Sequence, residues 1–226
     1  MIRWQLLLAG AVAVWLFFRN LPGALLCLWP GLLRARETDD DGSLDPAREP
    51  AMERIDGGLR ALGFEKVGAL SIRPPLSAGW AILVYATPGA PGPSASKGEG
   101  AFADVGVREG ALSVTFFTPF AGGGAILTSD HRRPAIERPG YLAGGLAGTD
   151  VPELWAVHRR RIEHFERPGV PWTDWSIAGR VAADEALYRG PGRRELRVRS
   201  APALLVTALA LALILISALQ LARQLR

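Results

Sequence analysis

The C-terminal run Ala201–Ala222 constrains the fold most strongly, because none of its 22 residues is charged. As an α-helix this run measures about 33 Å, which is enough to cross the hydrocarbon core of a bilayer. A soluble protein would have to bury such a helix on all faces, and that requires a much larger domain than a chain of 226 residues provides. We therefore predict a transmembrane helix over residues 201–222.

A second apolar region, residues 1–36, is interrupted by polar and helix-breaking residues. Its first run, Trp4–Phe18, ends at Arg19-Asn20 and Leu21-Pro22-Gly23, and a second run covers Ala24–Leu33. This pattern predicts one short spanning helix followed by an interfacial segment, with its tryptophans at headgroup depth. No Ala-x-Ala site follows the apolar core, so a retained anchor is favoured over a cleaved signal peptide. A tight hairpin of two short helices is the third interpretation.

Arginines flank the two apolar regions unequally, with eight on the side of the central domain and three on the opposite side. The eight are Arg19, Arg34, Arg36, Arg189, Arg193, Arg194, Arg197 and Arg199, and the three are Arg3, Arg223 and Arg226. By the positive-inside rule this excess predicts a cytoplasmic domain. Arg3 precedes the first apolar run as it would in an export signal, so an exported, envelope-facing domain is an alternative.

The composition argues against several kinds of site. The net charge is +4, but all except two of the 26 basic residues are arginine, and no nucleic-acid-binding module accompanies them. Cys27 is the only cysteine, so neither an intramolecular disulfide nor a multi-cysteine metal site can form. His158 and His164 are six residues apart on a predicted helix and point in different directions. We expect no nucleic-acid partner, no metal and no cofactor.

Residues 37–50 are acidic, contain Pro and Gly, and lack apolar periodicity, which predicts a solvated linker. A soluble domain is expected over residues 51–189. It begins with apolar residues at helical spacing, which predict a short amphipathic helix ending at Gly63. Those apolar residues are Met52, Ile55, Leu59 and Leu62.

The rest of this domain predicts an α+β fold. Short strand-like runs joined by turns indicate an antiparallel meander of about five strands, namely VGALSIR, WAILVYAT, AFADVGV, LSVTFF and AILTS. Two helices then follow, which can cover a face of the sheet. The first has Asp150 as its cap with Glu153 three residues later, and the second covers about Asp174–Tyr188. A basic juxtamembrane segment, residues 190–200, leads into the C-terminal span.

The stretch TPFAGGGAILTSDH places a glycine-rich corner ahead of Ser129, Asp130 and His131. Glycines permit the backbone angles of a tight turn, and no helix start or Gly-Lys-Ser/Thr sequence follows that would make a phosphate cradle. Consecutive residues of an extended segment point to alternate sides, so these three cannot form a catalytic relay among themselves. Ser129 assisted by His158 from the later helix remains the nucleophile to consider.

Other side chains are candidates for binding. His158 shares a helical face with Leu154 and Ile162, which favours a core histidine with satisfied ring nitrogens. Trp172 and Trp175 either line a ligand cleft or fasten their proline-bearing connector to the core. Four juxtamembrane arginines can hold the end of the domain against anionic lipid headgroups, namely Arg193, Arg194, Arg197 and Arg199.

One set of residues, Thr118-x-Phe120, Gly123, Ile126 and Thr128-Ser129 followed by Leu154-x-x-x-His158, resembles a pattern in uncharacterised bacterial membrane-anchored proteins. The resemblance covers roughly Gly63 to Phe165, and Gly122 stands where that pattern has an acidic or amide residue. It implies a shared domain, with Thr118, Gly123, Thr128, Ser129 and His158 as positions of interest. It implies no activity.

These features together predict a non-enzymatic domain, tethered to the bilayer at the cytoplasmic face of a bacterial inner membrane, that binds a protein partner or small ligand. A membrane-associated hydrolase using Ser129 or His158 is the first alternative, and an exported interaction domain is the second. Convergence of these two side chains in an open pocket would favour the hydrolase, and burial beneath the helix would favour the binding domain.

Overall fold

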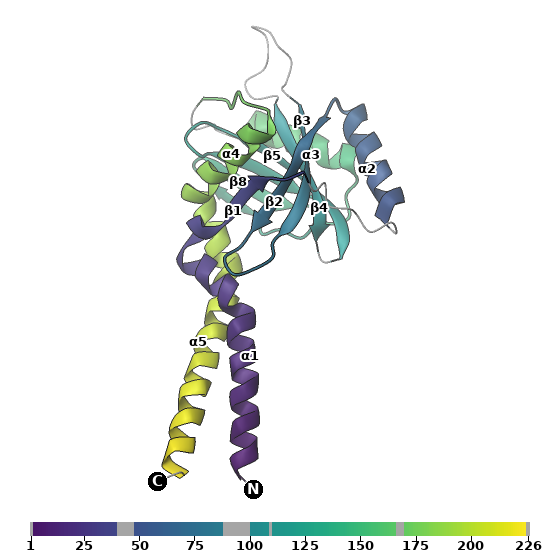
Figure 1. The fold of residues 1–226 in the computed structure, drawn as a ribbon. Helices are drawn as coiled ribbons and strands as arrows, with labels where there is room; N and C mark the ends of the chain where they lie inside the picture. Colours follow the sequence, from purple (N-terminus) through teal and green to yellow (C-terminus); the bar gives the residue numbers. More distant parts are fainter. Residues whose placement is uncertain (1, 40–47, 88–99, 109, 166–169, 225–226) are drawn as a thin grey trace. The chain divides into compact units, whose positions relative to one another are not determined.

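The structure, a computed structural model, describes residues 2–39, 48–87, 100–108, 110–165 and 170–224. The chain divides into two compact units, whose helices and strands are labelled in Figure 1. The helical unit comprises Met1–Leu33, Pro74–Ala78 and Arg194–Arg226, and the sheet domain comprises Arg34–Arg73 and Gly79–Arg193.

Two long helices, α1 (Ile2–Leu28) and α5 (Gly192–Gln224), dominate the helical unit, and a short 3-10 helix, η1 (Pro30–Leu32), follows α1. Both α1 and α5 are long and apolar enough to cross a membrane, as the sequence predicted. The predicted interruption near Pro22 is absent, because α1 continues through it, and α5 likewise continues through Pro202. A proline removes only its own N–H, and an adjacent helix can support the backbone around it. The predicted basic segment and C-terminal span are therefore one helix.

Small residues allow α1 and α5 to approach each other closely. A Cβ added to Gly23 would lie 2.6 Å from the Cβ of Ala203, and one added to Gly10 would lie 3.8 Å from that of Ser217. These two pairs show that the helices run antiparallel. Small side chains are the usual means by which membrane helices pack, because they let the backbones come together. Alanines are also buried in these helices, namely Ala13, Ala24 and Ala210.

The described part of the sheet domain contains one eight-stranded sheet in the order β1-β2-β3-β4-β5-β6-β8-β7. Neighbouring strands are antiparallel except for β6 and β8, which are parallel. The strands are β1 (Arg34–Glu37), β2 (Glu65–Arg73), β3 (Trp80–Thr87), β4 (Ala101–Arg108), β5 (Ala111–Pro119), β6 (Ala125–Ser129), β7 (Ile136–Arg138) and β8 (Tyr141–Gly145).

The predicted α+β class and the antiparallel meander are confirmed, since the five predicted runs are β2 to β6. Strands β1, β7 and β8 were not predicted. Strand β1 has the polar sequence RARE, β7 has three residues, and β8 ends in two glycines, so none shows a strong alternating pattern. The predicted linker overlaps β1 at Glu37, and its segment 40–47 lies outside the described residues, as does segment 88–99 between β3 and β4.

Helices cover both faces of this sheet. Helices α2 (Glu49–Ala61) and α3 (Val151–His164) pack on one face, where their apolar side chains meet Tyr85 and Phe116. Helix α4 (Ile177–Arg189) packs on the other face, where the guanidinium of Arg180 lies 4.3 Å from the ring centroid of Phe117. Figure 1 shows α3 and α4 on opposite sides of the sheet. The predicted cap of α3 is confirmed, because Asp150 Oδ1 accepts a hydrogen bond from the backbone N–H of Glu153 at 2.9 Å.

Candidate functional site

Strands β5 and β6 carry most of the hydroxyl side chains that the sequence singled out. Their antiparallel register pairs Phe116 with Thr128 and Thr115 with Ser129. Since side chains alternate along a strand, Thr128 points toward α3 while Ser129 points toward the opposite face. The consecutive residues Thr128 and Ser129 therefore belong to two different polar networks.

The first network surrounds His158, which is fully buried beneath α3. Its Nε2 atom lies 3.0 Å from Thr118 Oγ1, and its Nδ1 atom lies 2.9 Å from Thr128 Oγ1. Arg161, one turn further along α3, donates from Nη1 to Thr128 Oγ1 at 3.0 Å. The structure thus brings together three of the predicted site residues, Thr118, Thr128 and His158, and adds an arginine that the sequence argument did not include.

The partners of the two threonines determine which group donates and which accepts at each contact with His158. Thr118 donates its single hydroxyl proton to the carbonyl oxygen of Gly100, so it accepts from the Nε2–H of His158. Thr128 accepts from Arg161, so its own proton is free to reach Nδ1 of His158. The network therefore assigns a neutral imidazole with its proton on Nε2. Every hydrogen-bonding group of the ring has one partner.

The electrostatics agree with a neutral ring. Burial, and to a smaller extent the positive charge of Arg161, lower the pKa of His158 to about 3. A general base works best when its pKa is near the operating pH and it reaches the reacting group. His158 meets neither condition, because its pKa lies far below neutral pH and its enclosed ring already has a hydrogen-bond partner at both nitrogens. Its arrangement is that of a residue that fixes α3 to the sheet.

Ser129 lies in the second network, on the face away from His158. It is fully buried, and its Oγ atom lies 2.9 Å from Thr115 Oγ1 on the neighbouring strand. The structure does not bring Ser129 and His158 together, because the sheet separates their side chains. In this geometry His158 cannot accept the proton of Ser129.

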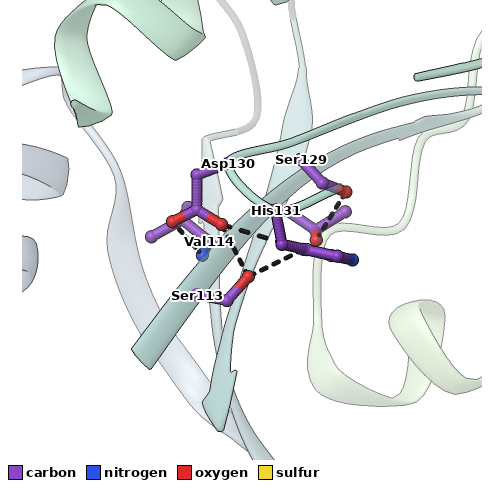
Figure 2. Close-up of polar contacts among 6 residues, drawn as sticks. Ser113, Val114, Ser129, Asp130 and His131 are labelled. Carbon is purple, nitrogen blue, oxygen red and sulfur yellow. Dashed lines mark hydrogen bonds and ion pairs between the residues drawn. The ribbon is translucent and has the colours of Figure 1, made fainter. Parts of the chain in front are cut away.

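A second serine, Ser113, was not predicted from the sequence, and it lies next to Asp130 and His131. Figure 2 shows its hydroxyl between them, 2.6 Å from Asp130 Oδ1 and 2.8 Å from His131 Nδ1. Asp130 Oδ2 also accepts from the backbone N–H of Val114 at 2.8 Å. Ser113 donates its hydroxyl hydrogen bond to the Asp130 carboxylate, so toward His131 its oxygen acts as the acceptor of the Nδ1–H. A catalytic relay has a different order, because its histidine takes the serine proton and the acid orients the histidine.

A buried charged cluster that was not predicted from the sequence joins α4 to β4. Arg180 forms two hydrogen bonds with Asp104, from Nε at 3.1 Å and from Nη2 at 2.6 Å, and its Nη1 lies 2.7 Å from Asp184 Oδ1. Burial alone would lower the pKa of Arg180, but the two carboxylates outweigh it and raise that pKa, so the guanidinium stays charged. Burial raises the pKa of the Asp184 carboxyl. The i,i+4 spacing of Arg180 and Asp184 was the available signal, but such pairs usually lie on exposed helix faces.

The remaining predicted positions have local structural roles. Gly123 has φ +88° and its added Cβ would lie 2.8 Å from the carbonyl oxygen of Ala186, so the β5–β6 corner requires glycine there. The ring of Trp175 packs against Phe102 at 5.0 Å between centroids, and Trp172 Nε1 donates to the carbonyl oxygen of Asp174 at 2.7 Å. Trp175 thus packs the connector between α3 and α4 against the sheet, whereas the hydrogen bond of Trp172 lies within the connector.

The four juxtamembrane arginines, Arg193, Arg194, Arg197 and Arg199, are exposed in the first turns of α5. Arg199 Nη1 lies 3.7 Å from Glu195 Oε1. Within the described residues, no group of three His, Cys, Asp or Glu side chains is placed to hold a metal ion. Comparisons with protein-family models, curated proteins and solved structures find no match for this chain.

Proposed function

We propose that this chain is a membrane-tethered domain that acts by binding a protein partner or small ligand near the cytoplasmic face of a bacterial inner membrane. The observation that carries the proposal is the surface of α1 and α5. Only 17% and 11% of their most apolar windows are buried, whereas the core helix of a soluble protein would be mostly buried. Helices that expose this much apolar surface are suited to contact with lipid.

Binding rather than catalysis is supported by the polar groups of the sheet domain. Thr118, Thr128, Ser129 and His158 are all buried, and each is hydrogen bonded to another protein group. A buried polar network of this kind specifies a unique packing of helix on sheet. The domain thereby gains a rigid scaffold, and contacts with a partner fall to its exposed loops and helix surfaces.

The cytoplasmic orientation rests on the arginine count. Eight arginines flank the two apolar runs at their domain-side ends and three flank them at the opposite ends. A single-cysteine labelling experiment tests it in bacterial cells, with Cys27→Ser as the background. Glu53→Cys on α2 reports on the domain side, and Gln224→Cys at the end of α5 reports on the opposite side; both positions are exposed.

We expect a membrane-impermeant maleimide to label Gln224→Cys in intact cells and Glu53→Cys only after lysis. The reverse pattern would establish the exported alternative. Extraction with alkaline carbonate is the matched test of anchoring, and we expect the full chain to stay in the membrane pellet. Release into the supernatant would overturn the tethered model whatever the labelling pattern.

A membrane-associated hydrolase is the second candidate, and the contact of Ser113 with Asp130 and His131 is the observation that favours it. A fluorophosphonate probe reacts with activated serines and separates the two proposals. We expect the purified full-length chain to remain unlabelled. Stoichiometric labelling that Ser113→Ala or Ser129→Ala abolishes, with the melting temperature kept, would establish a nucleophile and contradict a purely binding role.

A further inference from the structure

One charged residue interrupts the apolar surface of α1. Between Arg3 and Arg34 the sequence has a single ionisable basic side chain, Arg19, and it lies 15 residues beyond Trp4. Arg19 is exposed, and its guanidinium lies 4.9 Å from the ring centroid of Trp15, which is also exposed. Both side chains thus lie on the outer surface of the helix, away from the contacts with α5.

The guanidinium of Arg19 has no carboxylate partner among the described residues, where its only recorded contact is the Trp15 ring. The neighbouring Asn20 does not serve it, since Asn20 Nδ2 donates to the carbonyl oxygen of Leu16 at 2.9 Å. A charged side chain on a membrane-spanning helix is costly unless it reaches polar headgroups or water. Since no described carboxylate pairs with it, Arg19 has to reach water or an anionic headgroup instead.

The antiparallel packing of the two helices places Arg19 level with Thr207 of α5. Gly23 of α1 contacts Ala203 of α5. Because the helices are antiparallel, Arg19, four residues before Gly23, is level with Thr207, four residues after Ala203. Thr207 is a hydroxyl residue whose Oγ1 donates to the carbonyl oxygen of Ala203 at 2.8 Å. Below this level each helix has 15 residues without a charge, Trp4–Phe18 and Ala208–Ala222, or about 22 Å of helix.

We propose that Arg19, stacked on Trp15, binds the phosphate of a membrane phospholipid and thereby sets the depth at which α1 lies in the bilayer. This inference rests on the proposed membrane anchoring. Guanidinium groups form paired hydrogen bonds with phosphate oxygens, and tryptophan concentrates at the interface between headgroups and hydrocarbon. About 22 Å of uncharged helix is shorter than the hydrocarbon core of a bilayer. Local thinning of the bilayer, together with bending of the arginine side chain toward the headgroups, makes up the difference in length.

The consequence for the rest of α1 is specific. If phosphate groups meet Arg19, then Leu28, nine residues or about 13 Å further along the helix, lies on the water side of the headgroups. The last two turns of α1 then raise the end of the helix above the hydrocarbon. Without the phosphate contact, the apolar run from Leu21 to Leu28 would favour a deeper position.

The test uses the full-length chain with Cys27→Ser, reconstituted in dioleoylphosphatidylcholine vesicles and carrying a nitroxide at Phe18→Cys or Leu28→Cys. Power-saturation measurements with oxygen and a water-soluble nickel complex give the depth of each label. We expect the Phe18 label at headgroup depth and the Leu28 label in the aqueous region. Arg19→Leu should move both labels deeper by about one helical turn, or roughly 5 Å, and Arg19→Lys should move them much less.

Unchanged depth in Arg19→Leu, or a wild-type Leu28 label inside the hydrocarbon, would overturn the phosphate contact. Carbonate extraction of Arg19→Leu separates this inference from the proposed function. If the variant stays in the membrane and its depth is unchanged, only the role of Arg19 fails. If the wild-type chain is released by carbonate, the anchoring itself fails.

Discussion

Acid should weaken the sheet domain through His158. The pKa of this buried ring is about 3 in the folded chain, against an ordinary value of 6.5. The unfolded chain therefore takes up the proton first, and the stability contributed by the neutral ring is complete above pH 6.5. That stability is lost progressively as the pH falls from 6.5 toward 3.

The size of the effect at pH 5 follows from the unfolded state. At this pH an unfolded histidine is almost fully protonated, while folded His158 is still neutral. At about 1.36 kcal/mol per pKa unit, the interval from pH 6.5 to pH 5 corresponds to about 2 kcal/mol in the free energy of unfolding. The loss would approach about 5 kcal/mol near pH 3, where the folded ring also begins to titrate.

Urea titration of the full-length chain in detergent, followed by tryptophan fluorescence, measures this effect. His158→Gln is the control, because its amide titrates at neither pH. Gln can replace only part of the hydrogen bonding to Thr118 and Thr128, so the substitution should lower the free energy of unfolding by about 1 kcal/mol at pH 7. His158→Ala should cost more, about 1 to 3 kcal/mol, because it also removes packing.

The decisive quantity is the stability difference between wild type and His158→Gln at two pH values. Carboxylates titrate in both proteins and cancel in that difference. Between pH 7 and pH 5 the difference should change by about 2 kcal/mol in favour of the glutamine variant. A difference that does not change with pH would refute the neutral, enclosed histidine.

Two further predictions concern the opposite face of the sheet and the β5–β6 corner. Gly123→Val should lower the melting temperature far more than Ser129→Ala, because valine at φ +88° is strained and its Cβ meets a backbone carbonyl, whereas alanine removes one hydroxyl. Equal melting temperatures in the two variants would contradict the role of the corner. Loss of a cellular phenotype in a stable Ser129→Ala variant would point to a nucleophile. Arg180→Met should lower the free energy of unfolding by about 3 to 5 kcal/mol, because it leaves buried carboxylates without a cation. Its control is Arg189→Met, which breaks an exposed i,i+4 ion pair on the same helix and should lower that free energy by less than about 0.5 kcal/mol in the same urea titration. Similar costs for the two arginines would show that the buried cluster is not what holds α4.

The sequence by itself determined the features that depend on neighbouring residues. The uncharged run after Ser200 is helical because its composition and length leave few other solutions, and α5 contains all of it. Alternation with period two located β2 to β6, and it also separated Thr128 from Ser129 onto opposite faces. Asp150 capped α3 because capping involves a side chain and a backbone N–H only three residues away.

Tertiary structure decided which polar side chains meet. Thr118 and His158 are 40 residues apart, and Asp104 and Arg180 are 76 apart, so no local pattern connects them. Their contacts depend on strand register and on which face of the sheet each helix covers. A shift of one residue in the pairing of a strand would move each of its side chains to the other face of the sheet. The sequence therefore marked Thr118, Thr128 and His158 as separate positions, and only the packing of α3 on the sheet made them one network.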